Sequence, residues 1–138
     1  MEAVGKRRAH HTAATLGVIF WVCAVQACPA AAQTVTKIAS SNPLSSTPEA
    51  IAAGQKLYAK WCLQCHGESG DGLSPRWGRV GADLRKYWRG YTEFVNIVAA
   101  GRPEKRMPPW GSVLDMDQIN EIGAYVETLA LPGAKWKD

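Results

Sequence analysis

The stretch Cys62-Leu63-Gln64-Cys65-His66 sets two cysteines three positions apart and places a histidine directly after the second. A pair of cysteines this close can form a redox dithiol, half of a zinc site, or the attachment point of a haem. Each role requires different partners elsewhere in the chain. The remaining cysteines, histidines and methionines therefore decide between the three.

Residues 1–32 have the order of a secretory signal peptide. Basic residues at positions 6–8 precede an apolar run at residues 16–25, and small residues follow up to Ala32. This order predicts export with cleavage after Ala32. The apolar run is shorter than the roughly 18 residues that a membrane span needs.

Lipid attachment at Cys28 is the alternative to this cleavage. Residues 25–28 loosely resemble the box that precedes the lipid-modified cysteine of bacterial lipoproteins, although Gln26 fits that box poorly. The alternative would leave the chain anchored to a membrane surface rather than free.

Cleavage leaves few candidate ligands for a metal. Of four cysteines and three histidines, only Cys62, Cys65 and His66 lie beyond residue 32. A zinc site uses four protein ligands, or three and a water, which these residues do not supply. A thioredoxin-like dithiol is expected in a βαβ context, but no strand-like run precedes Cys62. The C-x-x-C-H pattern therefore predicts one covalently bound haem c, with thioether bonds from both cysteines and His66 on the iron.

The sixth iron ligand has two candidates, Met107 and Met116. Met107 lies in a proline-rich segment, residues 101–111, that is incompatible with a helix or a central strand. A rigid loop of this kind can hold a methionine over the open face of a haem, so we predict Met107 as the second axial ligand. Its alternative role is that of a gap-filling core methionine. Met116 is an ordinary position at the start of the last helix.

These residues together resemble a class I cytochrome c. In that family a glycine and an aromatic residue precede the first cysteine at spacings of four, as Gly54 and Tyr58 precede Cys62 here. The apolar positions of the last helix, at residues 119–129, match as well. The resemblance covers about residues 47–131. It implies an all-α cytochrome c fold, with three main helices and loops wrapped around one covalently bound haem.

Local signals predict the same three helices. Thr47 before Pro48 is typical of a helix start, and Thr92 can cap a second helix that Gly101 ends. Asp115 with a glutamine three residues later predicts a capping box. The first expected helix opens at Pro48 and carries Ile51, Leu57, Tyr58 and Trp61, and the other two span residues 93–100 and 115 to about 129. The glycine at position 54 is expected to let the first and last helices cross closely.

The segment between His66 and the second helix is predicted to be a loop around the haem edge. The family has a Gly-Pro-Asp-Leu segment here, whose backbone carbonyl orients the proximal histidine. This chain has Gly81-Ala82-Asp83-Leu84, which lacks the rigid proline ring but keeps the carbonyl. One or two basic residues of the loop are expected to bind the haem propionates, and the others to be solvated. The basic candidates are Arg76, Arg79, Arg85, Lys86 and Arg89, and the tryptophans that could pack on the porphyrin are Trp77, Trp88 and Trp110.

The expected organisation has four parts. They are a signal peptide at 1–32, a flexible leader at 33–46, a cytochrome c domain at 47–131 and a C-terminal tail at 132–138. The formal net charge of +4 falls to about +2 without the signal. No basic helix accompanies this charge, so nucleic acid is not an expected partner.

We predict that the chain is a periplasmic one-electron carrier and not an enzyme. Its iron would cycle between the ferric and ferrous states with His66 and Met107 bound, accepting electrons from a dehydrogenase and passing them to a terminal oxidase. The loop at 107–111 and the tail at 133–136 are similar to those of small cytochromes that serve quinoprotein alcohol or methanol dehydrogenases.

Two other functions fit the same residues. A haem-based ligand sensor or peroxidase-like enzyme would use a displaceable Met107. A tethered haem subunit of a membrane redox complex would use the leader or a lipidated Cys28 as its anchor.

Overall fold

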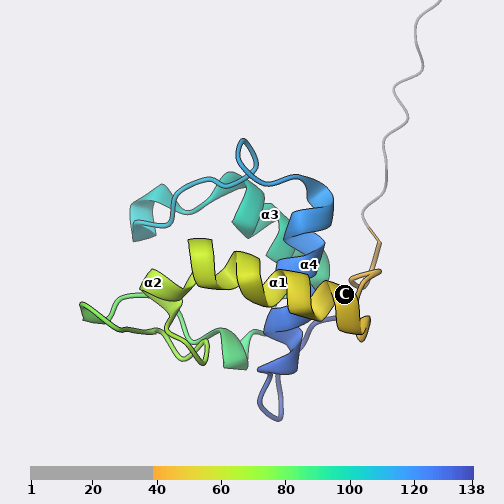
Figure 1. Ribbon diagram of the computed structural model, residues 1–138, viewed down its shortest axis with the longest axis horizontal. Coiled ribbons are helices and arrows are strands. Elements are labelled where there is room, and N and C mark those ends of the chain that lie inside the picture. The colour runs from red at the N-terminus through yellow and green to blue at the C-terminus, as the bar shows by residue number, and fades with distance from the viewer. Residues whose placement is uncertain (1–38) are drawn as a thin grey trace, which may run out of the picture. The chain divides into compact units, whose positions relative to one another are not determined.

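A computed structural model describes residues 39–138, so the predicted signal peptide and residues 33–38 of the predicted leader lie outside the described residues. The described residues fall within one compact unit and are mainly helical (Figure 1). The α-helices are α1 (Pro48–Trp61), α2 (Leu63–His66), α3 (Tyr91–Ala100) and α4 (Met116–Thr128). Two 3-10 helices, η1 (Leu84–Lys86) and η2 (Pro103–Lys105), and two short strands, β1 (Leu73–Ser74) and β2 (Gly78–Arg79), complete the fold.

Helices α1 and α4 cross at Gly54 and form the main helix pair of the fold (Figure 1). A Cβ atom at Gly54 would overlap the backbone carbonyl of Glu121 on α4. A glycine inside a helix costs about 1 kcal/mol relative to alanine, and here that cost permits backbone contact between two helices. The predicted packing role of Gly54 is confirmed.

The core lies where α1, α3 and α4 meet. Its fully buried side chains are Tyr58, Val95, Ile119, Ile122 and Val126. Burial of one such aliphatic or aromatic side chain contributes roughly 1.5 to 3 kcal/mol. The apolar stripe of α4 predicted from its helical period is thus the stripe that faces the core.

The helix ends agree with the sequence signals at α1 and α4. Thr47 is the N-cap residue of α1, although its side chain makes no capping hydrogen bond. Asp115 and Gln118 form the predicted reciprocal capping box at the start of α4.

The start of α3 differs from the prediction. The helix begins at Tyr91, two residues earlier, and its N-cap is Gly90 with φ of +82°. Thr92 therefore lies in the first turn, where its backbone N–H donates to the Asp138 carboxylate at 3.2 Å. A distant carboxylate thus accepts from a free N–H group in the first turn of α3, where the sequence predicts capping by the threonine side chain.

The segment after α2 is irregular, as predicted, but it contains a small hairpin. Strands β1 and β2 pair in antiparallel fashion with Leu73 opposite Arg79. A Cβ atom at Gly72 would overlap the carbonyl of Gly81. The glycine therefore brings the hairpin close to the segment that follows it.

The C-terminal residues pack on the fold. The backbone N–H of Lys135 donates to the carbonyl of Tyr87 at 2.7 Å, and that of Leu131 donates to the carbonyl of Arg85 at 2.8 Å. The ring of Trp136 lies 4.8 Å from that of Tyr87 and 5.2 Å from that of Phe94. The tail thus covers the segment that leads into α3.

Residues before α1 pack on α4. The buried side chain of Asn42 donates to the carbonyl of Asn120 at 2.8 Å, and the Ser45 hydroxyl donates to Glu127 at 2.5 Å. The backbone N–H of Asp138 donates to the carbonyl of Ser40 at 2.9 Å. Packed residues therefore flank the predicted domain 47–131 on both sides. Between residues 39 and 138, no helix combines the length and apolarity that a bilayer crossing requires.

Candidate cofactor site

A cavity of about 680 Å³ opens beside α1 and α2. Its volume falls within the roughly 300 to 1,000 Å³ of typical ligand sites. In Figure 1 the two segments that contribute to its lining, the one after α2 and the one after α3, lie on opposite sides of α1. Cys62, Cys65, His66 and Met107 all line this cavity. The fold therefore brings the four predicted site residues to one place.

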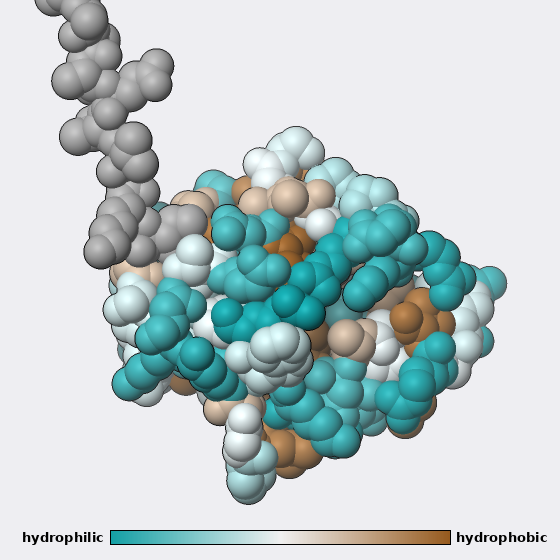
Figure 2. Space-filling view, turned by 180° about the vertical axis from the view of Figure 1, so that it is seen from behind, coloured by the Kyte–Doolittle hydropathy of each residue, from teal (hydrophilic) through white to brown (hydrophobic). Residues whose placement is uncertain are grey.

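The lining is mainly apolar. It includes Trp61, Val80, Leu84, Phe94 and Val98. On the face shown in Figure 2, hydrophobic surface is visible in hollows bordered by hydrophilic residues. An apolar lining with a few polar groups is typical of sites that enclose a large hydrophobic cofactor.

One turn of chain carries the two cysteines and the histidine. The backbone N–H groups of Cys65 and His66 both donate to the carbonyl of Cys62, at 3.1 and 2.9 Å. Residues three positions apart in a helical turn lie on the same face. The C-x-x-C-H spacing thus places both sulfurs and the imidazole on the cavity side of α2.

The thiol chemistry of this turn does not suit a redox dithiol. Burial, and secondarily the neighbouring Cys65, raise the pKa of the Cys62 thiol to about 12. The reactive cysteines of disulfide oxidoreductases have pKa values lowered below about 7.5, because the thiolate is the nucleophile. The Cys62 thiol is protonated at neutral pH, so the electrostatics of the site oppose dithiol exchange.

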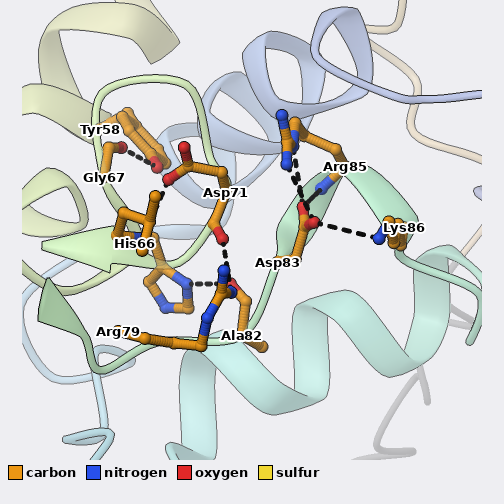
Figure 3. A network of polar contacts seen from close by, with 10 residues as sticks. Tyr58, His66, Gly67, Asp71, Arg79, Ala82, Asp83, Arg85 and Lys86 are labelled. Carbon is orange, nitrogen blue, oxygen red and sulfur yellow. Dashed lines mark hydrogen bonds and ion pairs between the residues drawn. The ribbon is translucent and has the colours of Figure 1, made fainter.

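His66 is oriented by a backbone carbonyl. Its Nδ1 atom lies 3.0 Å from the carbonyl oxygen of Ala82 (Figure 3). Since a carbonyl only accepts hydrogen bonds, Nδ1 carries the proton and Nε2 keeps a free lone pair. Burial lowers the pKa of His66, and the bond to Ala82 opposes this shift. The predicted carbonyl contact is confirmed, and the imidazole is neutral, as a metal ligand must be.

Gly81 makes this contact possible. A Cβ atom at this position would lie 2.6 Å from the carbonyl oxygen of Cys65 and 2.8 Å from Nδ1 of His66. The backbone N–H of Gly81 also donates to that carbonyl at 3.0 Å. The family motif contained this glycine, but its steric role depends on a close approach of two distant segments that the sequence does not reveal.

The chain just after His66 is fixed by Tyr58. The buried phenol donates to the carbonyl of Gly67 at 2.7 Å (Figure 3). Burial raises the pKa of Tyr58 well above its usual value, so the phenol stays protonated and remains a donor. The aromatic residue of the family pattern thus anchors the end of α2.

Met107 lies on a loop that closes on itself. The backbone N–H of Arg102 donates to the carbonyl of Met107 at 2.8 Å, and the N–H of Met107 donates back at 3.0 Å. A Cβ atom at Gly101 would lie 2.5 Å from the backbone carbon of Pro108. Met116, by contrast, is 48% exposed and does not line the cavity. Of the two methionines, Met107 alone lines the cavity.

The predicted tryptophan candidates differ in exposure, and two of the predicted basic candidates form ion pairs. Trp110 lines the cavity and packs on Trp61 with ring centroids 5.2 Å apart, whereas Trp77 and Trp88 are 58% and 63% exposed at its edge. Arg85 is bound to Asp83 at 2.9 Å, and Lys86 lies 3.7 Å from the same carboxylate (Figure 3).

In this helical domain, a C-x-x-C-H turn and a loop methionine line one apolar cavity. This arrangement is characteristic of the c-type cytochromes. The family model described as "Cytochrome C oxidase, cbb3-type, subunit III" matches residues 49–126, which is more than half of the chain. The chain belongs to this family. It therefore binds haem c covalently, and the site described above fits that group in volume, apolar lining and donor set.

A curated relative is the quinohemoprotein alcohol dehydrogenase ADH-IIG of Pseudomonas putida. It is 32% identical over an alignment of 99 residues that covers 68% of this chain. The match spans only 13% of that enzyme's length. The solved structure of the same enzyme matches 67% of this chain with a TM-score of 0.51 at 30% identity.

Two solved cytochromes share the fold. Cytochrome CL from the marine methylotrophic bacterium Methylophaga aminisulfidivorans MPT has a TM-score of 0.53 and 25% identity, covering 65% of this chain and 59% of its own. The c-type cytochrome XoxG from Methylobacterium extorquens AM1 has a TM-score of 0.51 and 26% identity, covering 64% of this chain and 55% of its own. The predicted all-α cytochrome c fold is confirmed.

Proposed function

We propose that this chain is a periplasmic one-electron carrier in which Cys62 and Cys65 form the thioether bonds to haem, and His66 and Met107 bind the iron. The observation that supports this most strongly is that all four residues line one apolar cavity. When bound, haem c supplies a couple between Fe(III) and Fe(II) that transfers single electrons.

His66 and Met107 would hold the iron, and the residues around them fix both side chains in place. Ala82 holds the His66 imidazole in one tautomer through Nδ1. The paired backbone of Arg102 and Met107 fixes the methionine loop. The apolar lining excludes water, and a methionine ligand raises the reduction potential. Because His66 and Met107 would both bind the iron, substrates would have no access to it, which favours electron transfer over catalysis.

The donor in this proposal is a quinoprotein alcohol or methanol dehydrogenase. Support comes from the match to part of the quinohemoprotein alcohol dehydrogenase of Pseudomonas putida and from the resemblance to cytochrome CL. A terminal oxidase is the proposed acceptor.

An optical spectrum of the exported holoprotein tests the carrier function. We expect a low-spin c-type spectrum in both oxidation states, and no change when carbon monoxide is added to the reduced form. Mixing with a quinohaemoprotein alcohol dehydrogenase and its alcohol should reduce the haem. Rapid binding of carbon monoxide would instead support the sensor or peroxidase-like function, and an oxidised haem after mixing would exclude this donor.

A second candidate is a tethered haem subunit of a membrane oxidase. It is favoured by the description of the matching family as an oxidase subunit. Mass spectrometry of the mature N-terminus separates the two. A chain that starts at Gln33 supports the free carrier, and a diacylated Cys28 supports the anchored subunit.

A further inference from the structure

The loop that carries Met107 holds one residue in an unfavourable backbone conformation. The backbone pair between Arg102 and Met107 encloses η2 and Arg106. Arg106 has a φ of +63°, in the left-handed region that a non-glycine residue rarely adopts. Such a conformation persists only where the surrounding structure holds it. Contacts around the loop therefore contribute to keeping it closed.

Backbone contacts attach the base of the loop to the C-terminal end of α3. On one side, the loop follows directly after Gly101, the C-cap residue of the helix. On the other side, the backbone N–H groups of Trp110 and Gly111 donate to carbonyls near the end of α3, each at 3.0 Å. These hydrogen bonds do not involve Arg102 or Met107.

The side chain of Arg102 makes a further contact with α3. Its guanidinium donates to the carboxylate of Glu93 at 3.2 Å, and Glu93 lies in the first turn of the helix. The ion pair thus spans roughly two helical turns. Glu104 is only two positions from Arg102, yet these two residues form no ion pair. Among residues 39–138, the other ion pairs lie within residues 83–86, so this one alone joins the Met107 loop to a helix.

The ion pair lies at the edge of the cofactor cavity and is partly shielded from water. Arg102 lines the cavity, whereas Glu93 does not. The two side chains are 25% and 40% exposed. Partial burial strengthens the attraction between the charges, and the remaining exposure makes it sensitive to salt.

We propose that Glu93 is a positioning residue for Met107 and acts through Arg102. The inference rests on the proposed role of Met107 as an axial ligand, and it adds the residue that keeps the ligand loop closed. Arg102 and Met107 exchange two backbone hydrogen bonds, at 2.8 and 3.0 Å. A displacement of Arg102 therefore moves Met107, and the Glu93 carboxylate restrains that displacement. Without this carboxylate the loop opens more often and admits competing ligands to the iron.

Displacement of Met107 by imidazole tests the proposal on the ferric holoprotein. At saturating imidazole and about pH 8, where this probe is mainly neutral, the first-order rate constant reports how often the loop opens. The variants are Glu93→Ala, Arg102→Gln and the two combined. The control is Glu104→Ala, which removes an exposed carboxylate of the same loop and changes the net charge equally. Glu104 makes no ion pair with a described residue.

We expect Glu93→Ala to raise this rate constant about two- to fivefold, as loss of a partly exposed ion pair would. Arg102→Gln should have a similar effect. The double variant should be no faster than either single variant, because both changes remove the same interaction. Added salt should accelerate the wild type towards Glu93→Ala, since salt screens the pair. Glu104→Ala should stay within about 1.5-fold of the wild type.

The methionine-to-iron charge-transfer band should be present in every variant before imidazole is added. It shows that the resting ligand is unchanged and that only the opening of the loop differs.

Three results would overturn the proposal. Equal rate constants for Glu93→Ala and Glu104→Ala would reduce the effect to net charge. Additive effects of Glu93→Ala and Arg102→Gln would show that Arg102 acts on another group, such as a haem propionate. The same acceleration in Ser45→Ala, which removes a hydrogen bond to α4 instead, would make the effect a general loss of stability.

Failure of the carrier function looks different. The wild type itself would then lack the charge-transfer band, or would bind imidazole without a slow first-order step.

Discussion

The orientation of the His66 imidazole depends on Gly81, which lies against the ring. The missing side chain of Gly81 leaves room for the imidazole, and the next residue supplies the carbonyl that fixes its tautomer. Orientation of a metal-bound histidine by such a contact typically changes affinity or activity 10- to 100-fold. The strength of the proposed bond from His66 to the haem iron would thus depend on backbone geometry rather than on another titratable group.

Gly81→Ala should weaken the proposed bond between His66 and the haem iron. The added Cβ atom would lie 2.8 Å from Nδ1 of His66, so the ring or the segment must move. We expect a partly high-spin spectrum and a lower reduction potential, both measured on the purified holoprotein. Ala82→Gly is the matched control, because it removes a methyl group and keeps the carbonyl. An unchanged spectrum in Gly81→Ala would contradict the steric role.

Met107→Ala should open the iron to external ligands. The methionine-to-iron charge-transfer band should disappear, and carbon monoxide should bind the reduced protein within the mixing time. Met116→Ala is the control, since its side chain is exposed and outside the cavity. Equal behaviour of the two variants would remove Met107 from the proposed ligand pair.

At the scale of the elements, the crossing of α1 and α4 holds the cavity wall in place. Helix α1 leads directly into the Cys62–His66 turn, and α1 packs against the buried face of α4. At Gly54 the backbones of the two helices approach closely. A change at this position therefore affects both global stability and the location of Cys62.

Gly54→Ala should destabilise the holoprotein by about 1 to 3 kcal/mol or more, as overpacking does in a rigid core. The contact is with backbone, which cannot rotate away as a flexible side chain can. Chemical denaturation measures the free energy of unfolding. Ala52→Leu on the exposed side of α1 adds more volume and should change that free energy by less than about 0.5 kcal/mol. Equal losses in both variants would refute the crossing argument.

Glu127 near the end of α4 should make stability depend on pH. Burial raises the pKa of its carboxyl, opposed by the Ser45 hydroxyl and by Lys137. A carboxyl whose pKa is higher in the folded than in the unfolded state contributes stability at low pH, and that contribution is lost as pH rises through the folded pKa. We expect Glu127→Gln to lack this loss. Denaturation of both proteins from about pH 4 to pH 8 would show the difference, and parallel pH profiles would contradict it.

The sequence predicted what is encoded over a few neighbouring residues. The Cys62–His66 turn and the Asp115 capping box each need only a short window, and both were identified correctly. The cap of α3 could not be found this way, because its carboxylate lies 46 positions away at Asp138. Strands of two residues are likewise too short to show an alternating pattern. The steric role of Gly81 was hidden for the same reason, since it arises only when two loops meet.

At the scale of the whole domain, the C-terminal residues contribute to stability. Trp136 packs against Tyr87 and Phe94, and both of these residues also line the cavity. The tail thus packs against residues that line the cavity without lining it itself. Residues of the predicted tail therefore affect how firmly the cofactor site is held.

Trp136→Ala should cost about 2 to 3 kcal/mol of unfolding free energy, less than the roughly 3 to 5 kcal/mol of a fully buried tryptophan. Trp136→Phe should cost much less. Its ring keeps the aromatic packing, and the buried Nε1 that it removes has no hydrogen-bond partner among residues 39–138. Denaturation of both variants measures the difference, and equal losses would argue against packing as the source of stability.

The hydrogen bond between Asp138 and Ser40 joins the two ends of the described fold. In mechanical terms, a pull on the chain upstream of residue 40 is borne first by this hydrogen bond and then by the contacts of Asn42 and Ser45 with α4. The Met107 loop is not on that path. A domain held in this way can be tethered, or inserted into a longer chain, without load on the loop that carries Met107.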